Sequence, residues 1–205
     1  MHGSCVTISP DRRPTLVVMV KEPRAGRVKT RLGRDIGMVP AAWWFRHQVW
    51  RLLRRVDDPR WRSVLAVAPD GAVASRTFPA HLPRIPQGHG DLGARMARVF
   101  RSLPPGPVCI VGGDVPGIDP GHIARAFRAL APVDAVFGPA ADGGYWLVGL
   151  KRTGVVPAGL FESVRWSSEH ALADSAATLP GARIAYVDRL RDVDGAADLR
   201  ALSLL

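Results

Sequence analysis

TLVVMV at residues 15–20, followed by KEPRAGRVKTRL at residues 21–32, is the stretch that decides the fold of this chain. Its first part is a continuous apolar run rich in β-branched side chains, which is typical of a strand covered on both faces. Similar runs recur at residues 63–68 (SVLAVA) and 107–111 (PVCIV). From Met38 to Val56 apolar residues return every three or four positions, as in an amphipathic helix. Strands that alternate with helices predict an α/β fold, with a mainly parallel sheet and helices on both faces.

The second half of the sequence departs from this alternation and predicts a mixed arrangement. The expected strands cover residues 134–137, 145–150 and 182–187. The expected helices cover residues 92–103, 120–130, 168–179 and 196–204. Ser168 should cap the helix that starts there, with Glu169 in its first turn. We expect one domain over residues 15–205, preceded by a flexible leader at residues 1–14.

Length and composition bound the class of protein. With 205 residues, of which 47% are hydrophobic, the chain can bury one sizeable core and is too apolar to be disordered. No apolar run approaches the ~18–20 residues that a membrane helix needs. The polar start lacks the apolar segment of a secretory signal. Of the two cysteines, Cys109 lies in an apolar run, where a buried reduced thiol is the ordinary state. These features favour a cytoplasmic protein that does not bind a membrane.

The charge balance raises nucleic-acid binding as a rival function. The chain carries 28 basic and 18 acidic residues, a net charge of +10. A charge of this sign attracts nucleic acids. However, the arginines are scattered along the whole chain, and two of the three lysines fall within residues 21–32. This distribution argues against nucleic acid as the ligand.

The loop after the first strand is the best candidate for binding phosphates. Ligands of open parallel sheets bind beyond the carboxyl ends of the strands, which is where this loop begins. Gly26 lets the backbone approach an anion closely. The side chains that could neutralise a di- or triphosphate are Lys21, Arg27, Lys29 and Arg31. The spacing is not that of a Walker loop, and a solvated basic loop is the alternative interpretation.

Two further loops carry carboxylates at expected strand ends. Asp114 follows the third strand within Gly112-Gly113-Asp114-Val115-Pro116 and is suited to ligate Mg²⁺ or Mn²⁺ together with substrate phosphates. Alternatively, it stabilises a turn. Asp142 stands in Asp142-Gly143-Gly144 before the strand that starts at Tyr145. Taken alone, this segment indicates an ordinary hairpin turn, and the functional alternative is a site that binds the hydroxyls of a sugar or acceptor.

Taken together, these segments resemble a known family, the rSAM/selenodomain-associated transferases, which are glycosyltransferases of the arsenosugar-biosynthesis type. The family pattern K-x-P-x-x-G-x-V-K-T-R-L is matched at residues 21–32, and G-D-L-G-x-R-M at residues 90–96. G-x-D-x-P is matched at residues 112–116, and G-P-A-x-D-G-G-Y-x-L-x-G-L at residues 138–150. F-x-x-V-x-W-S is matched at residues 161–167. The resemblance spans about residues 15–200.

The resemblance implies a fold and a set of site residues. The fold is GT-A, the Rossmann-like three-layer αβα sandwich of nucleotide-diphospho-sugar transferases. The phosphate- and nucleotide-binding residues would be Lys21, Pro23, Gly26, Arg27, Lys29, Thr30, Arg31, Gln87, Asp91, Leu92 and Gly93. The sugar or acceptor would contact Asp142, Gly143, Gly144, Tyr145 and Trp166. Asp114 would bind the metal, Mg²⁺ or Mn²⁺, with Asp194 as a second ligand, although the Thr-Pro that follows this aspartate in many relatives is missing here.

These residues lead to two enzymatic hypotheses and one from another class. The first is glycosyl transfer from a nucleotide sugar to a small-molecule acceptor, with Asp142, Lys29 and Arg31 as catalytic residues. The second is nucleotidyl transfer, in which a phosphorylated small molecule attacks a nucleoside triphosphate and pyrophosphate leaves, as in the guanylyltransferases that the family more distantly resembles. The third is a module that binds nucleotide or nucleic acid without catalysis. The sequence does not predict the oligomeric state.

Overall fold

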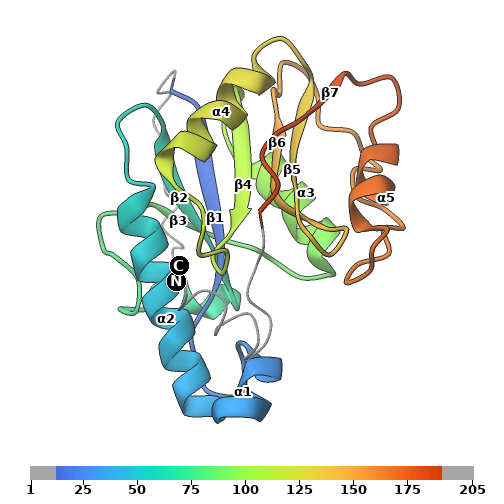
Figure 1. The fold of residues 1–205 in the computed structure, drawn as a ribbon. Coiled ribbons are helices and arrows are strands. Elements are labelled where there is room, and N and C mark those ends of the chain that lie inside the picture. The colour runs from blue at the N-terminus through green and yellow to red at the C-terminus, as the bar shows by residue number, and fades with distance from the viewer. Residues whose placement is uncertain (1–12, 191–205) are drawn as a thin grey trace.

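The computed structural model describes residues 13–190, which form one seven-stranded sheet between two layers of helices (Figure 1). The strand order is β3-β2-β1-β4-β6-β5-β7. The strands are β1 (Thr15–Lys21), β2 (Arg62–Ala68), β3 (Arg84–Pro86), β4 (Val108–Gly112), β5 (Ala135–Pro139), β6 (Tyr145–Leu150) and β7 (Ile184–Tyr186). The helices are α1 (Thr30–Ile36), α2 (Met38–Arg55), α3 (Leu92–Ser102), α4 (Pro120–Leu130) and α5 (Ala171–Ala177), with a 3₁₀ turn at Asp70–Ala72.

The direction of β6 gives the sheet its mixed character. β1 pairs in parallel with β2 and β4, β2 with β3, and β5 with β7, whereas β6 runs antiparallel to both β4 and β5. The carboxyl end of β5 and the amino end of β6 therefore lie at the same edge of the sheet as the carboxyl ends of β1 and β4. Residues 140–144 join β5 to β6 at this edge as a hairpin.

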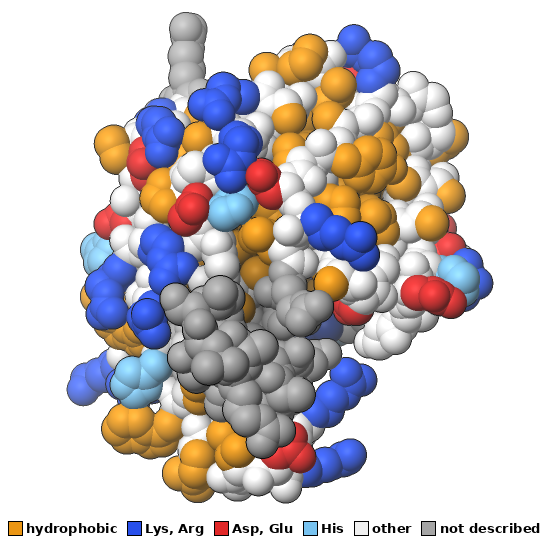
Figure 2. Space-filling model, viewed as in Figure 1, with side chains coloured by type: hydrophobic (Ala, Val, Ile, Leu, Met, Phe, Trp, Pro, Cys, Tyr) orange, Lys and Arg blue, Asp and Glu red, His pale blue; other side chains and the backbone are white. Residues whose placement is uncertain are grey.

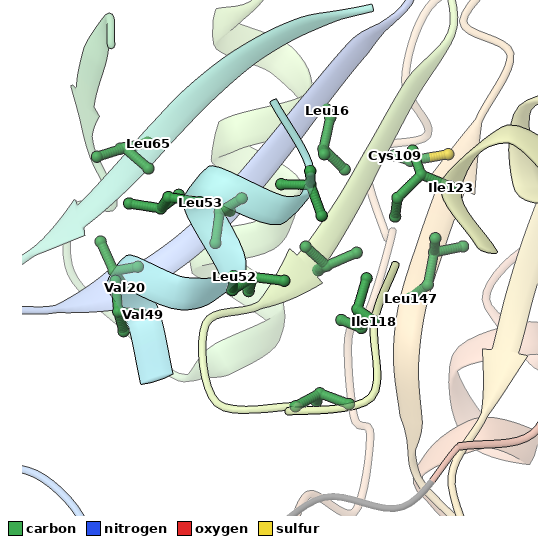
Figure 3. Packing of buried hydrophobic residues seen from close by; sticks show 14 of the residues in the cluster. Leu16, Val20, Val49, Leu52, Leu53, Leu65, Cys109, Ile118, Ile123 and Leu147 are labelled. Carbon is green, nitrogen blue, oxygen red and sulfur yellow. The ribbon is translucent and has the colours of Figure 1, made fainter. Parts of the chain in front are cut away.

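Alternating side chains of the strands form two cores, one on each face of the sheet. Leu16, Val18 and Val20 of β1 pack with α2 and α4, whereas Val17 between them packs with α3 on the opposite face. Figure 3 shows the first core, in which Val49, Leu52 and Leu53 of α2 meet the sheet. Val17 and its neighbours Leu16 and Val18 are fully buried. The continuous apolar run is therefore explained by burial on both faces, as the sequence predicted.

Several segments differ from the prediction, and strand β3 (Arg84–Pro86) was not expected at all. The helix expected over residues 168–179 is shorter, Ala171–Ala177, and no side chain caps it. Ser168 instead donates from Oγ to the carbonyl of Arg165 (2.6 Å) and accepts from the N–H of His170, so it stabilises the loop before the helix. Helix α1 was not predicted, because its seven residues include Gly33 and lack an apolar period.

Some expectations fall on residues that the structure does not describe. The closing helix at residues 196–204, Asp194 and most of the expected leader, residues 1–12, lie outside the described range of 13–190. Within that range no helix is long and apolar enough to cross a membrane. Cys109 is a buried free thiol, and burial raises its pKa, so it stays protonated, as expected. Lys and Arg side chains are spread over the face shown in Figure 2, with many of them over α2.

Candidate active site

A cavity of about 930 Å³ opens at the edge of the sheet where β1 and β4 end and β6 begins. Its floor is formed by residues from these three strands, including Met19, Ile110 and Val148. The three loops singled out from the sequence all contribute to its walls. The predicted site residues among the lining are Lys21, Arg27, Lys29, Thr30, Arg31, Gln87, Asp91, Leu92, Asp114, Asp142, Gly144, Tyr145 and Trp166. Pro23, Gly26, Gly93 and Gly143 are not part of it.

The loop after β1 brings a buried ammonium group into the cavity. Lys29 has a left-handed backbone (φ 45°) and directly precedes α1, so the chain turns sharply at this residue. Its side chain is only 7% exposed, and its Nζ lies 2.9 Å from Oδ2 of Asp114. The same ammonium lies 6.0 Å from the centre of the Trp44 ring on α2. The sequence did not predict that the candidate phosphate ligand would pair with the candidate metal ligand.

The loop that carries Asp114 is held from two sides. The N–H of Gly113 donates to the carbonyl of Met19 (3.0 Å) on β1, and a Cβ at Gly113 would lie 2.9 Å from Val20. On the other side Nη1 of Arg55, the last residue of α2, donates to the carbonyls of Pro116 and Ile118. The Asp114 side chain is 39% exposed, so its carboxylate is fixed in place yet accessible from the cavity.

Asp114 has the donor atoms for a divalent ion that is shared with substrate phosphates. Among residues 13–190 no three His, Cys, Asp or Glu side chains cluster around a common metal position. Mg²⁺ commonly keeps several waters and binds through one or two carboxylates plus substrate phosphates. Asp114 beside a cationic loop provides one such carboxylate. The second expected ligand, Asp194, lies outside the described residues.

The turn at Asp142 combines a structural role with access to the cavity. Oδ1 of Asp142 accepts from the N–H of Gly144 (3.0 Å), which closes a local turn. Gly143 has φ 87°, and a Cβ there would lie 2.4 Å from the backbone of Glu169. Its carbonyl also accepts from the N–H of Leu172 (3.1 Å). Gly143 therefore allows the hairpin to pack against the loop before α5, and it faces that loop.

Aromatic side chains form the wall between this hairpin and α3. The ring centres of Tyr145 and Trp166 are 6.4 Å apart at a steep angle. The Tyr145 hydroxyl bonds Oγ of the fully buried Ser175 (3.1 Å), and burial raises the pKa of Tyr145, so the hydroxyl stays protonated. A Cβ at Gly93 would lie 2.8 Å from the Trp166 ring. Gly93 thus lets α3 approach this wall.

Gln87 lines the cavity, but its side-chain amide is fully hydrogen-bonded to other residues of the protein. The residue is 2% exposed, and Nε2 donates to the carbonyls of Val20 (3.0 Å) and Ala66 (2.8 Å). Its Oε1 accepts from Nη1 of Arg95 (3.2 Å). The side chain therefore ties the end of β3 to β1 and β2.

Sequence reasoning missed two charged residues that line the cavity, Arg95 and Glu169. Arg95 stands one turn after Asp91, and this spacing is the signal that both residues face the same side of α3. Glu169 was interpreted as a first-turn residue of a helix that in fact begins at Ala171.

Similarity to known structures supports a transferase fold. A structure described as a "putative nucleotide-diphospho-sugar transferase" from Desulfovibrio desulfuricans G20 is 27% identical, with a TM-score of 0.79, over 92% of this chain and 85% of that one. Rv0371c from Mycobacterium tuberculosis, in complex with manganese, is 16% identical (TM-score 0.53; 93% and 97% covered). CMP:2-keto-3-deoxy-manno-octonic acid synthetase with CTP is 13% identical (TM-score 0.56; 94% and 97% covered).

These likenesses confirm the predicted fold class, a three-layer α/β fold with a largely parallel sheet and a mixed second half, of the GT-A and nucleotidyltransferase type. No curated protein matches this chain. The profile of one family matches residues 52–168, more than half of the chain. The chain therefore belongs to the family described as "Uncharacterized protein conserved in bacteria (DUF2064)".

Proposed function

We propose that this protein is a metal-dependent glycosyltransferase that moves a sugar from a nucleotide diphosphate to a small-molecule acceptor. The observation that carries the proposal is the convergence of three loops on one cavity. The first supplies Lys29 and Arg31, the second Asp114, and the third Asp142. These loops bring together cations, a carboxylate suited to a metal and a possible base around a space large enough for a nucleotide sugar.

In this proposal Lys29 and Arg31 bind the diphosphate, and Asp114 holds Mg²⁺ or Mn²⁺ with the help of the phosphates. A bound ion would supply Lewis-acid stabilisation of the leaving diphosphate. Because Lys29 is buried and paired before substrate arrives, it can stabilise the charge that develops on the leaving group with little reorganisation. Lys21 and Arg27 extend the same cationic wall, and Thr30 adds a hydroxyl group.

Asp142 and the aromatic wall act on the acceptor. The carboxylate of Asp142 uses Oδ1 in its turn, which leaves Oδ2 to receive the proton of an acceptor hydroxyl. The hydroxyl oxygen forms a bond to the anomeric carbon as the bond from that carbon to the diphosphate breaks, and the electron pair leaves with the nucleotide. Tyr145 and Trp166 line the cavity and would offer apolar ring surface to the sugar.

Nucleotidyl transfer is the second candidate, and the structural similarity to a synthetase solved with CTP favours it. The same cations would then bind a triphosphate, and catalysis would again rest on positioning and charge neutralisation. Product analysis separates the reactions: released nucleoside diphosphate supports glycosyl transfer, and released pyrophosphate supports nucleotidyl transfer.

The first experiment is a thermal-shift screen of nucleotides and nucleotide sugars with and without Mn²⁺. A ligand at 100 times its Kd stabilises the protein by about 2.7 kcal/mol. For a domain of this size that corresponds to a rise in Tm of roughly 5–11 °C. A protein that responds to none of these compounds, and instead binds nucleic acid with a steep salt dependence, would refute both transferase functions. The finer relation to the arsenosugar-biosynthesis type of enzyme rests on the sequence motifs alone.

A further inference from the structure

The cavity contains a guanidinium group that is held in place but keeps unused donors. Nε of Arg95 donates to the carbonyl of Asp91 (3.1 Å), and Nη1 donates to Oε1 of Gln87 (3.2 Å). An arginine has five N–H donors. Within residues 13–190 no acceptor is bonded to Nη2 of Arg95. The side chain lines the cavity, so the unused donors belong to a group that is already oriented there.

Gln87, which the family resemblance implies is a nucleotide-binding residue, has no free polar atom to contact a nucleobase. Both hydrogens of its amide nitrogen are directed at backbone carbonyls, and its oxygen accepts from Arg95. Breaking any of these bonds would leave a polar group unpaired at a position that is 2% exposed, which is costly. Gln87 therefore positions Arg95, and Arg95 is the group that can contact a ligand.

Asp91 places an acceptor next to this donor. Its Oδ1 accepts from the N–H of Ala94 (2.8 Å) and caps α3, while the side chain remains exposed at the cavity. Leu92 beside it is 38% exposed, although it is a large apolar residue. A planar ligand that packs on Leu92 would meet a donor from Arg95 and an acceptor from Asp91.

We propose that Arg95 is a specificity-determining residue that selects a guanine nucleotide, an inference that rests on the proposed function. A guanidinium can only donate, and guanine offers it two adjacent acceptors, O6 and N7. The neighbouring N1–H and N2–H of guanine match the carboxylate of Asp91. Adenine places an amino group where guanine has O6, so a donor would face a donor. Uracil and cytosine offer fewer of these matches.

The test is isothermal titration of GDP, UDP, CDP and ADP into the full chain at fixed salt with Mn²⁺. GDP should bind wild type roughly ten- to a hundredfold more tightly than ADP, the discrimination expected of one bidentate arginine contact. Arg95→Met should reduce this preference to about threefold or less by weakening GDP while leaving ADP nearly unchanged. Asp91→Asn keeps a good helix cap but replaces one acceptor, and it should also reduce the GDP preference.

Arg98→Met is the matched control. Arg98 lies one turn further along α3 and donates to the carbonyls of Gln87 and His89, so its loss loosens the same loop without removing a group from the cavity. It should keep the preference for GDP. Circular dichroism of each variant checks that α3 remains folded.

Four outcomes would overturn the proposal. If ADP binds wild type as tightly as GDP, or if Arg95→Met weakens all four nucleotides equally, the base is not read by Arg95, and the proposed function survives. Equal weakening of all four nucleotides would indicate that Arg95 contacts a phosphate instead. If Arg98→Met abolishes the preference as fully as Arg95→Met, loop rigidity is responsible. If none of the four nucleotides binds, the proposed function fails as well.

Discussion

Replacing Lys29 with methionine should strengthen the binding of free Mn²⁺ and weaken the binding of nucleoside diphosphates. The ammonium of Lys29 lies 2.9 Å from the carboxylate that is proposed to hold the metal, so ion and ammonium compete for Asp114. An exposed ion pair contributes about 0.2–1 kcal/mol of favourable free energy. Removing one partner of a buried pair costs about 2–5 kcal/mol of free energy. Lys29 is 7% and Asp114 39% exposed, which places this pair between the two classes.

An intermediate contribution of about 1–2 kcal/mol corresponds to a five- to thirtyfold gain in affinity for free Mn²⁺. The loss of a charged hydrogen bond to phosphate, about 1.5–3 kcal/mol, should weaken a nucleoside diphosphate about ten- to 150-fold. The corresponding nucleoside should bind as before. Titration followed by the electron paramagnetic resonance signal of free Mn²⁺ measures the first effect, and calorimetry measures the second.

Lys21→Met serves as the control, because it removes one positive charge from the same cavity without touching Asp114. This substitution should change the affinity for free Mn²⁺ by no more than about twofold, because the charge of an exposed lysine is screened by solvent and salt. Weaker Mn²⁺ binding in Lys29→Met than in wild type would refute the competition. The double variant Lys29→Met/Asp114→Asn should lose Mn²⁺ binding, because the affinity gained in Lys29→Met depends on the carboxylate of Asp114.

Three further substitutions test the site and the fold. Asp114→Asn should abolish the effect of metal on nucleotide binding. The protein should stay folded, since asparagine can still accept a hydrogen bond from Lys29. Undiminished metal dependence in a thermal-shift assay would place the ion elsewhere. Asp142→Asn keeps the acceptor for Gly144, so donor affinity should hold within a few-fold while turnover falls by ~10²–10⁴; near-normal turnover would leave Asp142 a turn residue only. Leu147→Ala removes a fully buried side chain from the core in Figure 3 and should cost about 2–5 kcal/mol in urea denaturation, and a cost below 1 kcal/mol would contradict the close packing seen there.

Much of the fold could be predicted because the buried positions of a strand or helix require apolar residues at a regular spacing in the sequence. The strand expected at residues 15–20 is observed at Thr15–Lys21, and the strand at Tyr145–Leu150 has the expected bounds. Helix α4 also has its expected bounds, since Asp119 caps it and Pro120 occupies its first turn. These signals are local, and tertiary contacts reinforce them.

The remaining features depend on contacts between distant residues. The turn at Asp142 indicates that β6 runs antiparallel to β5, but nothing near β6 in sequence indicates that it also pairs with β4. Strand β3 has only three residues and ends in proline. The pairing of Lys29 with Asp114 joins residues 85 positions apart. Gln87 was read as a ligand contact because its burial, which commits its amide to β1 and β2, cannot be seen in a single sequence.

The reversed strand β6 also affects how this enzyme could diversify. Residues 140–144 link two adjacent strands directly, so a longer or shorter hairpin need not disturb any helix crossover. The parallel half, from β1 to β4, encloses the side of the cavity opposite this hairpin. If the proposed function holds, a change in hairpin length would alter the acceptor side of the cavity and leave the nucleotide side as it is. On the proposed function, grafting a hairpin of another length onto this sheet should change acceptor choice and retain the nucleotide, a separation that follows from the direction of one strand.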